Sequence, residues 1–406
     1  MSPSEVTLQA VRDARERIQA AIYYSPCSHS HSLSEIAGHP TYLKLENLQL
    51  TGAFKERGAL NKILTLSQRE RQHGVIAASA GNHAQGVAFH ARSNSIGAKI
   101  VMPVMTPLVK VNATQGYGAE VVLHGDGYDE AYEEARRLAK EEHLTFVHPF
   151  DDPVVIAGQG TIGLEVLEQV PDLEAIIVPI GGGGLISGIA CAVKELKPKV
   201  RVIGVQAARM PSMLEARKHR RPTTIAVKPT IADGIAVRRA GELTFPLVER
   251  YVDEIVAVEE EEIASGILTL LEKEKTLAEG AGAAAVAALL HHKTELKNQK
   301  TVALVCGGNI DVSLLSRIIE RGLVKDARLL RLQIHLSDRP GSLLQLSRII
   351  AAHHINIVEL KFDRAYYGVS LGDTLIDITL ETRGQEQINR ILQALSEAGY
   401  RHDRVR

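Results

Sequence analysis

The sequence of 406 residues contains no tryptophan, few other aromatic residues and only three cysteines. Aromatic residues make up 4% of the chain, which disfavours a stacking platform for single-stranded nucleic acid. The cysteines, Cys27, Cys191 and Cys306, are too few and too scattered for a disulfide framework. The formal net charge of -1 leaves no basic excess for binding nucleic acid or a membrane surface. We therefore expect neither of those partners.

Long apolar runs and targeting signals are also missing. No apolar run approaches the ~20 residues that a helix needs to span a bilayer. The first residues have neither the basic stretch nor the apolar stretch of a secretory signal, so we expect a cytoplasmic protein. No spacing of histidines or cysteines matches a metal site, and we predict no metal ligands.

The chain does contain a repeated alternation of short β-branched runs with longer amphipathic stretches. Runs with the pattern of strands lie at residues 75–78, 99–103, 120–123, 145–147, 175–180 and 200–205. The alternation predicts an α/β fold with parallel sheets that helices cover on both faces. Residues 76–85, 176–188 and 302–314 each run from a strand through a glycine-containing turn into a helix. Because ligands bind at the carboxyl ends of such strands, these turns are candidate walls of a site.

The rhythm changes after residue 322. Residues 323–328 have the composition of a linker, and residues 329–406 follow the order βαββαβ, which is typical of a ferredoxin-like unit. We therefore predict a main domain over residues 1–322 and a separate small domain over residues 329–406.

Lys55 is the first candidate for chemistry. It follows Phe54 in the motif Thr51-Gly52-Ala53-Phe54-Lys55-Glu56-Arg57-Gly58-Ala59. A lysine at a helix start is usually solvated, but here Phe54 offers an apolar wall and the next helix has an apolar face. Burial lowers the pKa of a lysine, which suits an amine that binds an aldehyde and later removes a proton.

Two turns are candidates for binding anions. In Ser79-Ala80-Gly81-Asn82-His83, backbone N–H groups at a helix start can point at a negative group. The run Gly181-Gly182-Gly183-Gly184-Leu185 predicts a nest of N–H groups with a helix dipole behind it. No Gly-Lys-Ser/Thr follows these glycines and the dinucleotide fingerprint fails, so a small monophosphate fits this nest best.

Two further residues have more than one interpretation. Cys306, in Cys306-Gly307-Gly308-Asn309, is either a buried free cysteine that packs as a small apolar residue or part of a site. Glu279, in Ala278-Glu279-Gly280, is either a solvated acid at a helix start or part of a site.

These motifs together resemble those of pyridoxal-phosphate enzymes of the tryptophan-synthase-β type, known as fold type II, and most of all the serine/threonine ammonia-lyases. The resemblance covers residues ~20–320 and implies two α/β subdomains, the smaller and mobile one at about residues 45–150. It implies pyridoxal 5'-phosphate as the cofactor and Lys55 as the catalytic residue. The residues that it assigns to cofactor binding are Phe54, Lys55, Asn82, Gly181, Gly182, Gly183, Gly184, Leu185 and Cys306. It implies that Cys306 is a neutral partner for the nitrogen of the cofactor ring. Those that it assigns to substrate binding are Ser79, Ala80, Gly81 and His83.

The C-terminal part resembles the ACT domain, which senses small molecules, through Asp338-Arg339-Pro340-Gly341-Ser342-Leu343 and Asn356-Ile357. The resemblance implies an amino-acid effector, isoleucine or valine, bound near Gly341 and Asn356. It also implies a homodimer or a homotetramer. A purely structural appendage is the alternative.

The reaction that the resemblance implies is β-elimination of L-threonine to 2-oxobutyrate and ammonia, and of L-serine to pyruvate. A serine racemase is disfavoured because Ala80 stands where racemases carry a serine. Gln206, Met210 and Ser212 stand where those racemases bind a divalent metal, and they offer no carboxylate. A cysteine-synthase-like β-replacement enzyme and a non-catalytic amino-acid sensor are further alternatives.

Overall fold

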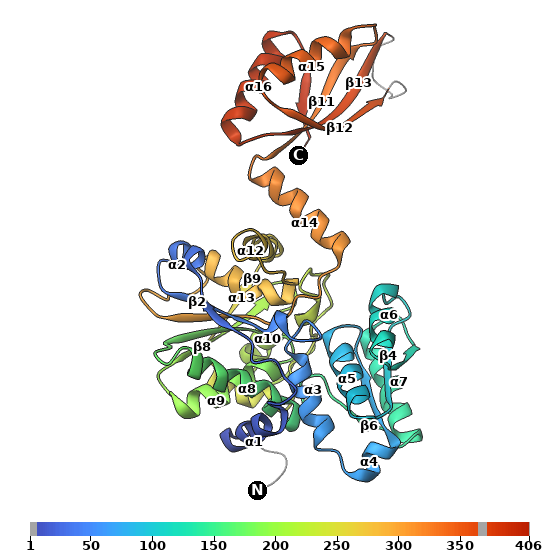
Figure 1. Ribbon diagram of the computed structural model, residues 1–406, viewed down its shortest axis with the longest axis vertical. Helices are drawn as coiled ribbons and strands as arrows, with labels where there is room; N and C mark the ends of the chain where they lie inside the picture. The colour runs from blue at the N-terminus through green and yellow to red at the C-terminus, as the bar shows by residue number, and fades with distance from the viewer. Residues whose placement is uncertain (1–5, 364–371, 406) are drawn as a thin grey trace. The chain divides into compact units, whose positions relative to one another are not determined.

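The computed structural model describes residues 6–363 and 372–405 (Figure 1). The chain divides into two units, Met1–Asp311 and Val312–Arg406. Helix α14 (Val312–Lys325) opens the second unit. Residues 323–325, which we expected in a linker, form its last turn because the helical pattern of apolar residues continues through them.

A six-stranded sheet forms the centre of the first unit, in the order β1-β2-β10-β7-β8-β9. Its strands are β1 (Cys27–His29), β2 (Thr41–Leu45), β7 (Ala175–Pro179), β8 (Arg201–Ala207), β9 (Glu254–Val258) and β10 (Thr301–Val305). All pairs are parallel except β1 with β2. Every residue of β7 and β10 is buried, which explains their continuous apolar sequences.

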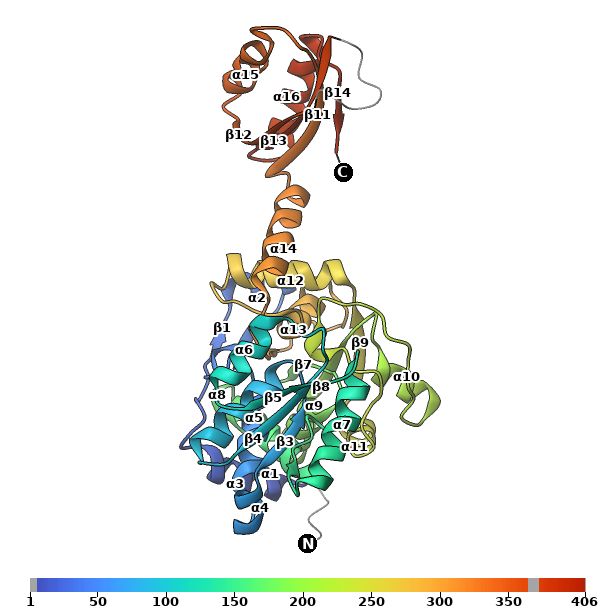
Figure 2. The same ribbon diagram turned by 90° about the vertical axis from the view of Figure 1, so that its right-hand side faces the viewer.

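Helices cover both faces of this sheet. Helix α13 (Gly280–Leu290) contacts β7, β8, β9 and β10, whereas α9 (Gly184–Leu196) contacts β7 and packs on α8 (Pro153–Gln169). In both views α13 lies on one side of the strands and α8 and α9 on the other (Figures 1 and 2).

A second sheet is fully parallel and has the order β5-β4-β3-β6. Its strands are β3 (Val75–Ala78), β4 (Ala98–Met102), β5 (Glu120–Leu123) and β6 (Thr145–Phe146), and its helices are α5 (Asn82–Ser93), α6 (Leu108–Gly116) and α7 (Tyr128–Glu141). Val75 and Ala77 of β3 share an apolar cluster with α5, whereas Ile76 and Ala78 share one with α7. Alternate residues of β3 therefore face different helices, and Figure 2 shows α5 and α7 flanking β3 and β4.

The second unit has the predicted order of elements. It consists, after α14, of β11 (Leu329–Ser337), α15 (Ser342–Ala352), β12 (Asn356–Asp363), β13 (Asp373–Glu381), α16 (Gln385–Glu397) and β14 (His402–Arg404). The strands form an antiparallel sheet in the order β12-β13-β11-β14. The predicted βαββαβ order is confirmed.

The other elements connect these layers. They are α1 (Leu8–Ile18), α2 (His31–Ala37), η1 (Glu46–Leu48), α3 (Lys55–Leu64), α4 (Gln68–His73), α10 (Ser212–His219), η2 (Asp233–Ile235), α11 (Thr244–Tyr251) and α12 (Glu260–Glu272). Within the described ranges, no helix combines the length and apolarity needed to cross a membrane.

Four buried charges fix the position of α3. The Arg57 guanidinium binds Glu46 at 2.7 Å and Glu165 of α8 at 2.6 Å. Lys44 of β2 binds the same Glu165 at 2.6 Å. Burial acts to raise the pKa of Glu46, but Arg57 outweighs burial and holds that pKa below its ordinary value. Two positive and two negative groups thus compensate one another inside the protein.

We predict that Arg57→Met lowers the free energy of unfolding by about 3–5 kcal/mol, because it leaves the buried Glu46 without its ion-pair partner and Glu165 with Lys44 alone. Urea denaturation measures this change. Arg137→Met is the control, since the Arg137 side chain is 52% exposed in its pairs with Glu134 and Glu141. It should cost less than about 1 kcal/mol. Equal losses in the two variants would contradict the assigned role of the buried cluster.

Candidate active site

Lys55 is the first residue of α3, and the loop before it is tied to the end of β10. Ala53 forms an antiparallel bridge with Gly307, and the Phe54 N–H donates to the Cys306 carbonyl at 3.0 Å. The lysine loop and the turn after β10 therefore meet through backbone hydrogen bonds, although ~250 residues separate them in the sequence. The Phe54 ring lies 5.3 Å from Lys55 Nζ and supplies the predicted wall.

The Lys55 amine lies in a setting that disfavours its charged form. Its Nζ donates a hydrogen bond to the Pro149 carbonyl at 2.8 Å. Burial lowers the pKa of Lys55 to about 8, although the neighbouring Cys306 and Glu279 act to raise it. A free amine is therefore present at a pH where an ordinary lysine stays protonated.

Asn82 begins α5, and both the nitrogen and the oxygen of its side-chain amide form hydrogen bonds. Its Nδ2 donates to Glu279 Oε1 at 2.7 Å, and its Oδ1 accepts from Asn309 Nδ2 at 2.8 Å. Asn309 Nδ2 also donates to the Thr51 carbonyl at 2.7 Å. Asn309 thus fixes which way the Asn82 amide faces. The sequence around Asn309 does not reveal this role, because its contact with Asn82 exists only in the folded chain.

Glu279 is buried, with 5% of its surface exposed, so the interpretation as a solvated acid is wrong. Burial and the charge of Asp233 raise the pKa of Glu279 to about 7, while the hydrogen bond from Asn82 acts to lower it. Its backbone N–H donates to the Gly307 carbonyl at 3.1 Å. A partly protonated carboxyl group therefore stands beside Asn82 near neutral pH.

The glycine run Gly181–Gly184 forms the turn between β7 and α9. Within the part of the chain that the structure describes, the N–H groups from Gly181 to Leu185 have no acceptor. A Cβ atom at Gly182 would lie 2.4 Å from the Phe150 ring, and Gly183 has φ = 102°. Glycine is therefore required there, and the unpaired N–H donors at a helix start suit a phosphate group.

In the turn after β3, the side chains of Ser79 and His83 form hydrogen bonds within the protein. Ser79 Oγ accepts from the Gly81 N–H at 3.2 Å, which closes the turn before α5. The His83 side chain is buried and its Nε2 contacts the Val147 carbonyl at 2.9 Å. Burial and the charge of Lys55 lower the pKa of His83 to about 3, so its ring is neutral. Contact of His83 with a substrate through its backbone N–H stays a prediction.

Cys306 directly follows the last residue of β10 and is buried. Burial and Glu279 raise the pKa of the Cys306 thiol well above its ordinary value, against the charge of Lys55. The thiol is therefore neutral, as a partner for an unprotonated ring nitrogen has to be.

Sequence reasoning missed the segment that follows β6. Pro149 accepts from Lys55, and Phe150 packs against Gly182. The Asp151 carboxylate accepts the N–H groups of residues 242–244 and caps the start of α11. The place of this segment in the sequence could have identified it. His148-Pro149-Phe150-Asp151 follows a parallel strand, and ligands bind at the carboxyl ends of such strands.

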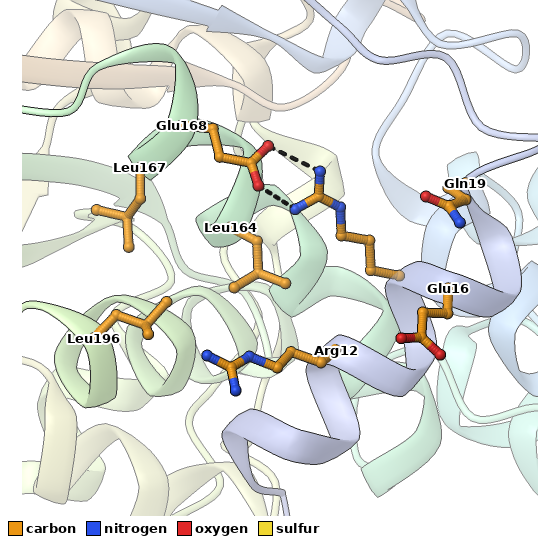
Figure 3. A pocket seen from close by; sticks show the side chains of 8 residues that line it. Arg12, Glu16, Gln19, Leu164, Leu167, Glu168 and Leu196 are labelled. Atoms are coloured by element: carbon orange, nitrogen blue, oxygen red, sulfur yellow. Dashed lines mark hydrogen bonds and ion pairs between the residues drawn. The ribbon is translucent and has the colours of Figure 1, made fainter.

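One hollow of the surface lies apart from this site. It has a volume of about 420 Å³ and lies between α1 and the helices α8 and α9, where Glu168 binds Arg15 (Figure 3). Its lining residues are Arg12, Arg15, Glu16, Gln19, Leu164, Leu167, Glu168 and Leu196, and it contains none of the predicted site residues.

Gln206, one of the positions compared with a divalent-metal site, has a structural role. Gln206 Oε1 accepts the N–H groups of Met213 and Leu214, both at 3.0 Å, and so caps the start of α10. No cluster of three or more histidine, cysteine, aspartate or glutamate residues with metal-binding geometry exists within residues 6–363 and 372–405.

We predict that Lys55 reacts with formaldehyde and borohydride half-maximally near pH 8, because burial releases its proton below the ~10.4 of ordinary lysines. Peptide mapping by mass spectrometry follows the methylation of Lys55 across a pH series on ligand-free protein. Exposed lysines in the same spectra provide the internal reference. A midpoint for Lys55 near that of the exposed lysines would refute the burial effect.

Comparison with known proteins places this geometry in a family. Residues 18–307 match the model of the family described as "Pyridoxal-phosphate dependent enzyme". The chain is 49% identical to an L-threonine ammonia-lyase of Thermotoga maritima over 395 residues, which cover 97% of this chain and 98% of that protein.

Solved structures agree with this match. A threonine deaminase isoform from Solanum lycopersicum superposes with a TM-score of 0.74 at 37% identity, over 79% of this chain and 92% of that one. Maize serine racemase also gives a TM-score of 0.74, at 33% identity over 79% of this chain and 98% of that one. The predicted α/β fold is confirmed, and the chain belongs to the family of pyridoxal-phosphate dependent enzymes.

Proposed function

We propose that this protein is an L-threonine ammonia-lyase that converts L-threonine to 2-oxobutyrate and ammonia, and L-serine to pyruvate. The observation that carries the proposal is a buried, deprotonatable Lys55 amine in a chain that is 49% identical to an L-threonine ammonia-lyase along nearly its whole length. The shared length includes the C-terminal unit, since the match covers 97% of the chain.

The residues present fit pyridoxal 5'-phosphate. Lys55 would hold its aldehyde, and the free N–H groups of Gly181–Leu185 would hold its phosphate. Asn82, oriented by Asn309 and Glu279, would reach the ring oxygen, and the neutral Cys306 thiol would face the ring nitrogen. When bound, the cofactor supplies an electron-accepting ring that eases removal of the α-proton of an amino acid.

The chain's own groups supply the remaining requirements. Lys55, with its pKa lowered to about 8, takes the α-proton of the substrate as a general base. The Pro149 carbonyl holds the lysine amine when it is free. The backbone N–H groups of Ala80, Asn82 and His83, at the start of α5, would receive the substrate carboxylate.

Among alternative reactions, racemisation has the similarity to maize serine racemase in its favour. Racemisation needs a second proton donor on the opposite face of the substrate, and the methyl side chain of Ala80 cannot provide one. The proposal is therefore elimination rather than racemisation.

The C-terminal unit is proposed to be an ACT-like regulatory domain that binds isoleucine or valine. Gly341 has φ = 91° and precedes α15, and Asn356 begins β12, where its Nδ2 donates to Glu381 at 3.3 Å. Asn356 pairs with Glu381 beside the start of β11, whereas Gly341 follows the end of β11. We therefore propose that the effector lies between paired units. We further propose a homodimer or homotetramer and a cytoplasmic location, which the three unpaired cysteines support.

Lys55→Ala should abolish both the visible absorbance band of the lysine-bound cofactor and the formation of 2-oxobutyrate from L-threonine, because no other amine replaces Lys55. Spectroscopy of the reconstituted protein and a 2-oxo acid assay measure the two losses. Lys140→Ala on the exposed face of α7 is the control and should retain both. Turnover that survives in the Lys55 variant would remove this residue from the proposed role.

Asn356→Ala should weaken the response of the enzyme to isoleucine or valine by at least about fivefold, since regulatory coupling of 1–3 kcal/mol depends on effector contacts. Turnover without effector should be unchanged. Titration of activity with each amino acid measures the response. Lys361→Ala on the same strand is the control, because Lys361 pairs with Glu359 at the surface. An unaltered response in the Asn356 variant would contradict this location of the effector site.

A further inference from the structure

His148 closes a tight turn directly after β6. Its Nδ1 accepts the N–H of Asp151 at 2.7 Å and the N–H of Phe150 at 3.2 Å. A side-chain acceptor that binds the N–H groups two and three residues later is the arrangement that asparagine and aspartate form in Asx turns. The histidine ring therefore shapes the backbone from residue 148 to residue 151.

Both candidate binding groups of the site contact this one turn. The Pro149 carbonyl, at its centre, accepts the hydrogen bond from Lys55 Nζ at 2.8 Å. The next residue, Phe150, packs on the glycine run so closely that a Cβ atom at Gly182 would lie 2.4 Å from its ring. The turn thus stands between the lysine amine and the N–H nest and contacts both.

The surroundings of the ring favour the form that can accept these bonds. The rings of Phe150, Tyr132 and Phe146 surround the imidazole, with centroid distances of 4.7, 6.0 and 6.1 Å. Burial lowers the pKa of His148 to about 4, with Lys55 and Arg136 adding to the effect and Asp152 opposing it. Near neutral pH the ring is neutral and carries its proton on Nε2, so that Nδ1 has a free lone pair.

We infer that His148 is a positioning residue that sets the separation between the Lys55 amine and the glycine nest by closing the turn at Pro149 and Phe150. The inference rests on the proposed function, in which the lysine holds one end of the cofactor and the nest holds the other. A rigid cofactor binds rapidly and tightly only when the two groups are already at the correct spacing.

The test compares His148→Asn with His148→Gln. Asparagine carries its acceptor oxygen on Cγ, the same position at which histidine carries Nδ1, and it forms this turn readily before a proline. Glutamine has the same amide group but places it one methylene further out, where it cannot close the turn. The two variants therefore differ in geometry and not in chemistry.

The measured quantities are the rate constant at which cofactor-free protein captures pyridoxal phosphate and the dissociation constant of the cofactor, both from the visible band. The Asn variant should remain within about twofold of the unchanged protein. The Gln variant should capture the cofactor at least about tenfold more slowly, because the binding groups are no longer held at their spacing. Thermal unfolding of both cofactor-free variants shows whether each is folded.

Equal capture rates in the two folded variants would overturn the inference, whether both match the unchanged protein or both are impaired. If the Gln variant does not fold, His148→Ser takes its place, because a hydroxyl closes the same turn more weakly and an intermediate rate is then expected. A capture rate for the Ser variant equal to that of the Asn variant would again overturn the inference. Failure of the unchanged protein to develop the band would instead count against the proposed function itself.

Discussion

The bridge between Ala53 and Gly307 is the constraint on which the site depends. It joins the loop before Lys55 to the turn after β10, and with the hydrogen bond from Phe54 to Cys306 it fixes where α3 begins. The same turn carries Asn309, which orients Asn82 on the next helix of the site. These contacts are hydrogen bonds between backbone groups or between side-chain amides in the interior of the protein. The groups of the site therefore hold their positions before any ligand binds.

Burial gives the site its acid–base character. The pKa of Lys55 falls to about 8 and that of Glu279 rises to about 7, so both groups titrate close to neutral pH. The thiol of Cys306 and the ring of His83 are neutral for the same reason. In contrast, Arg57, two residues after Lys55, and Glu46 remain charged, because each has a buried partner of opposite sign. The protein thus separates groups that react from groups that only hold α3 in place.

Much of the fold follows from local patterns in the sequence. The β-branched run at residues 175–180 predicted β7, and the βαββαβ order was readable after residue 328 because each element there has a clear period. The motif around Lys55 and the four glycines likewise marked local structures, a lysine at the start of α3 and a glycine turn before α9. The linker was less predictable. Only the structure shows that α14 extends through residues 323–325.

The sequence by itself determined the layers, the lysine and the glycine nest, since local periodicity and the special backbone of glycine need no distant partner to be recognised. Tertiary structure alone decided the burial of Glu279, the contact of Asn309 with Asn82 and the position of Pro149 next to Lys55. Each of these joins residues that are more than ninety positions apart. Burial and hydrogen bonding between such residues depend on how the sheets and helices pack, and no local sequence pattern encodes that packing.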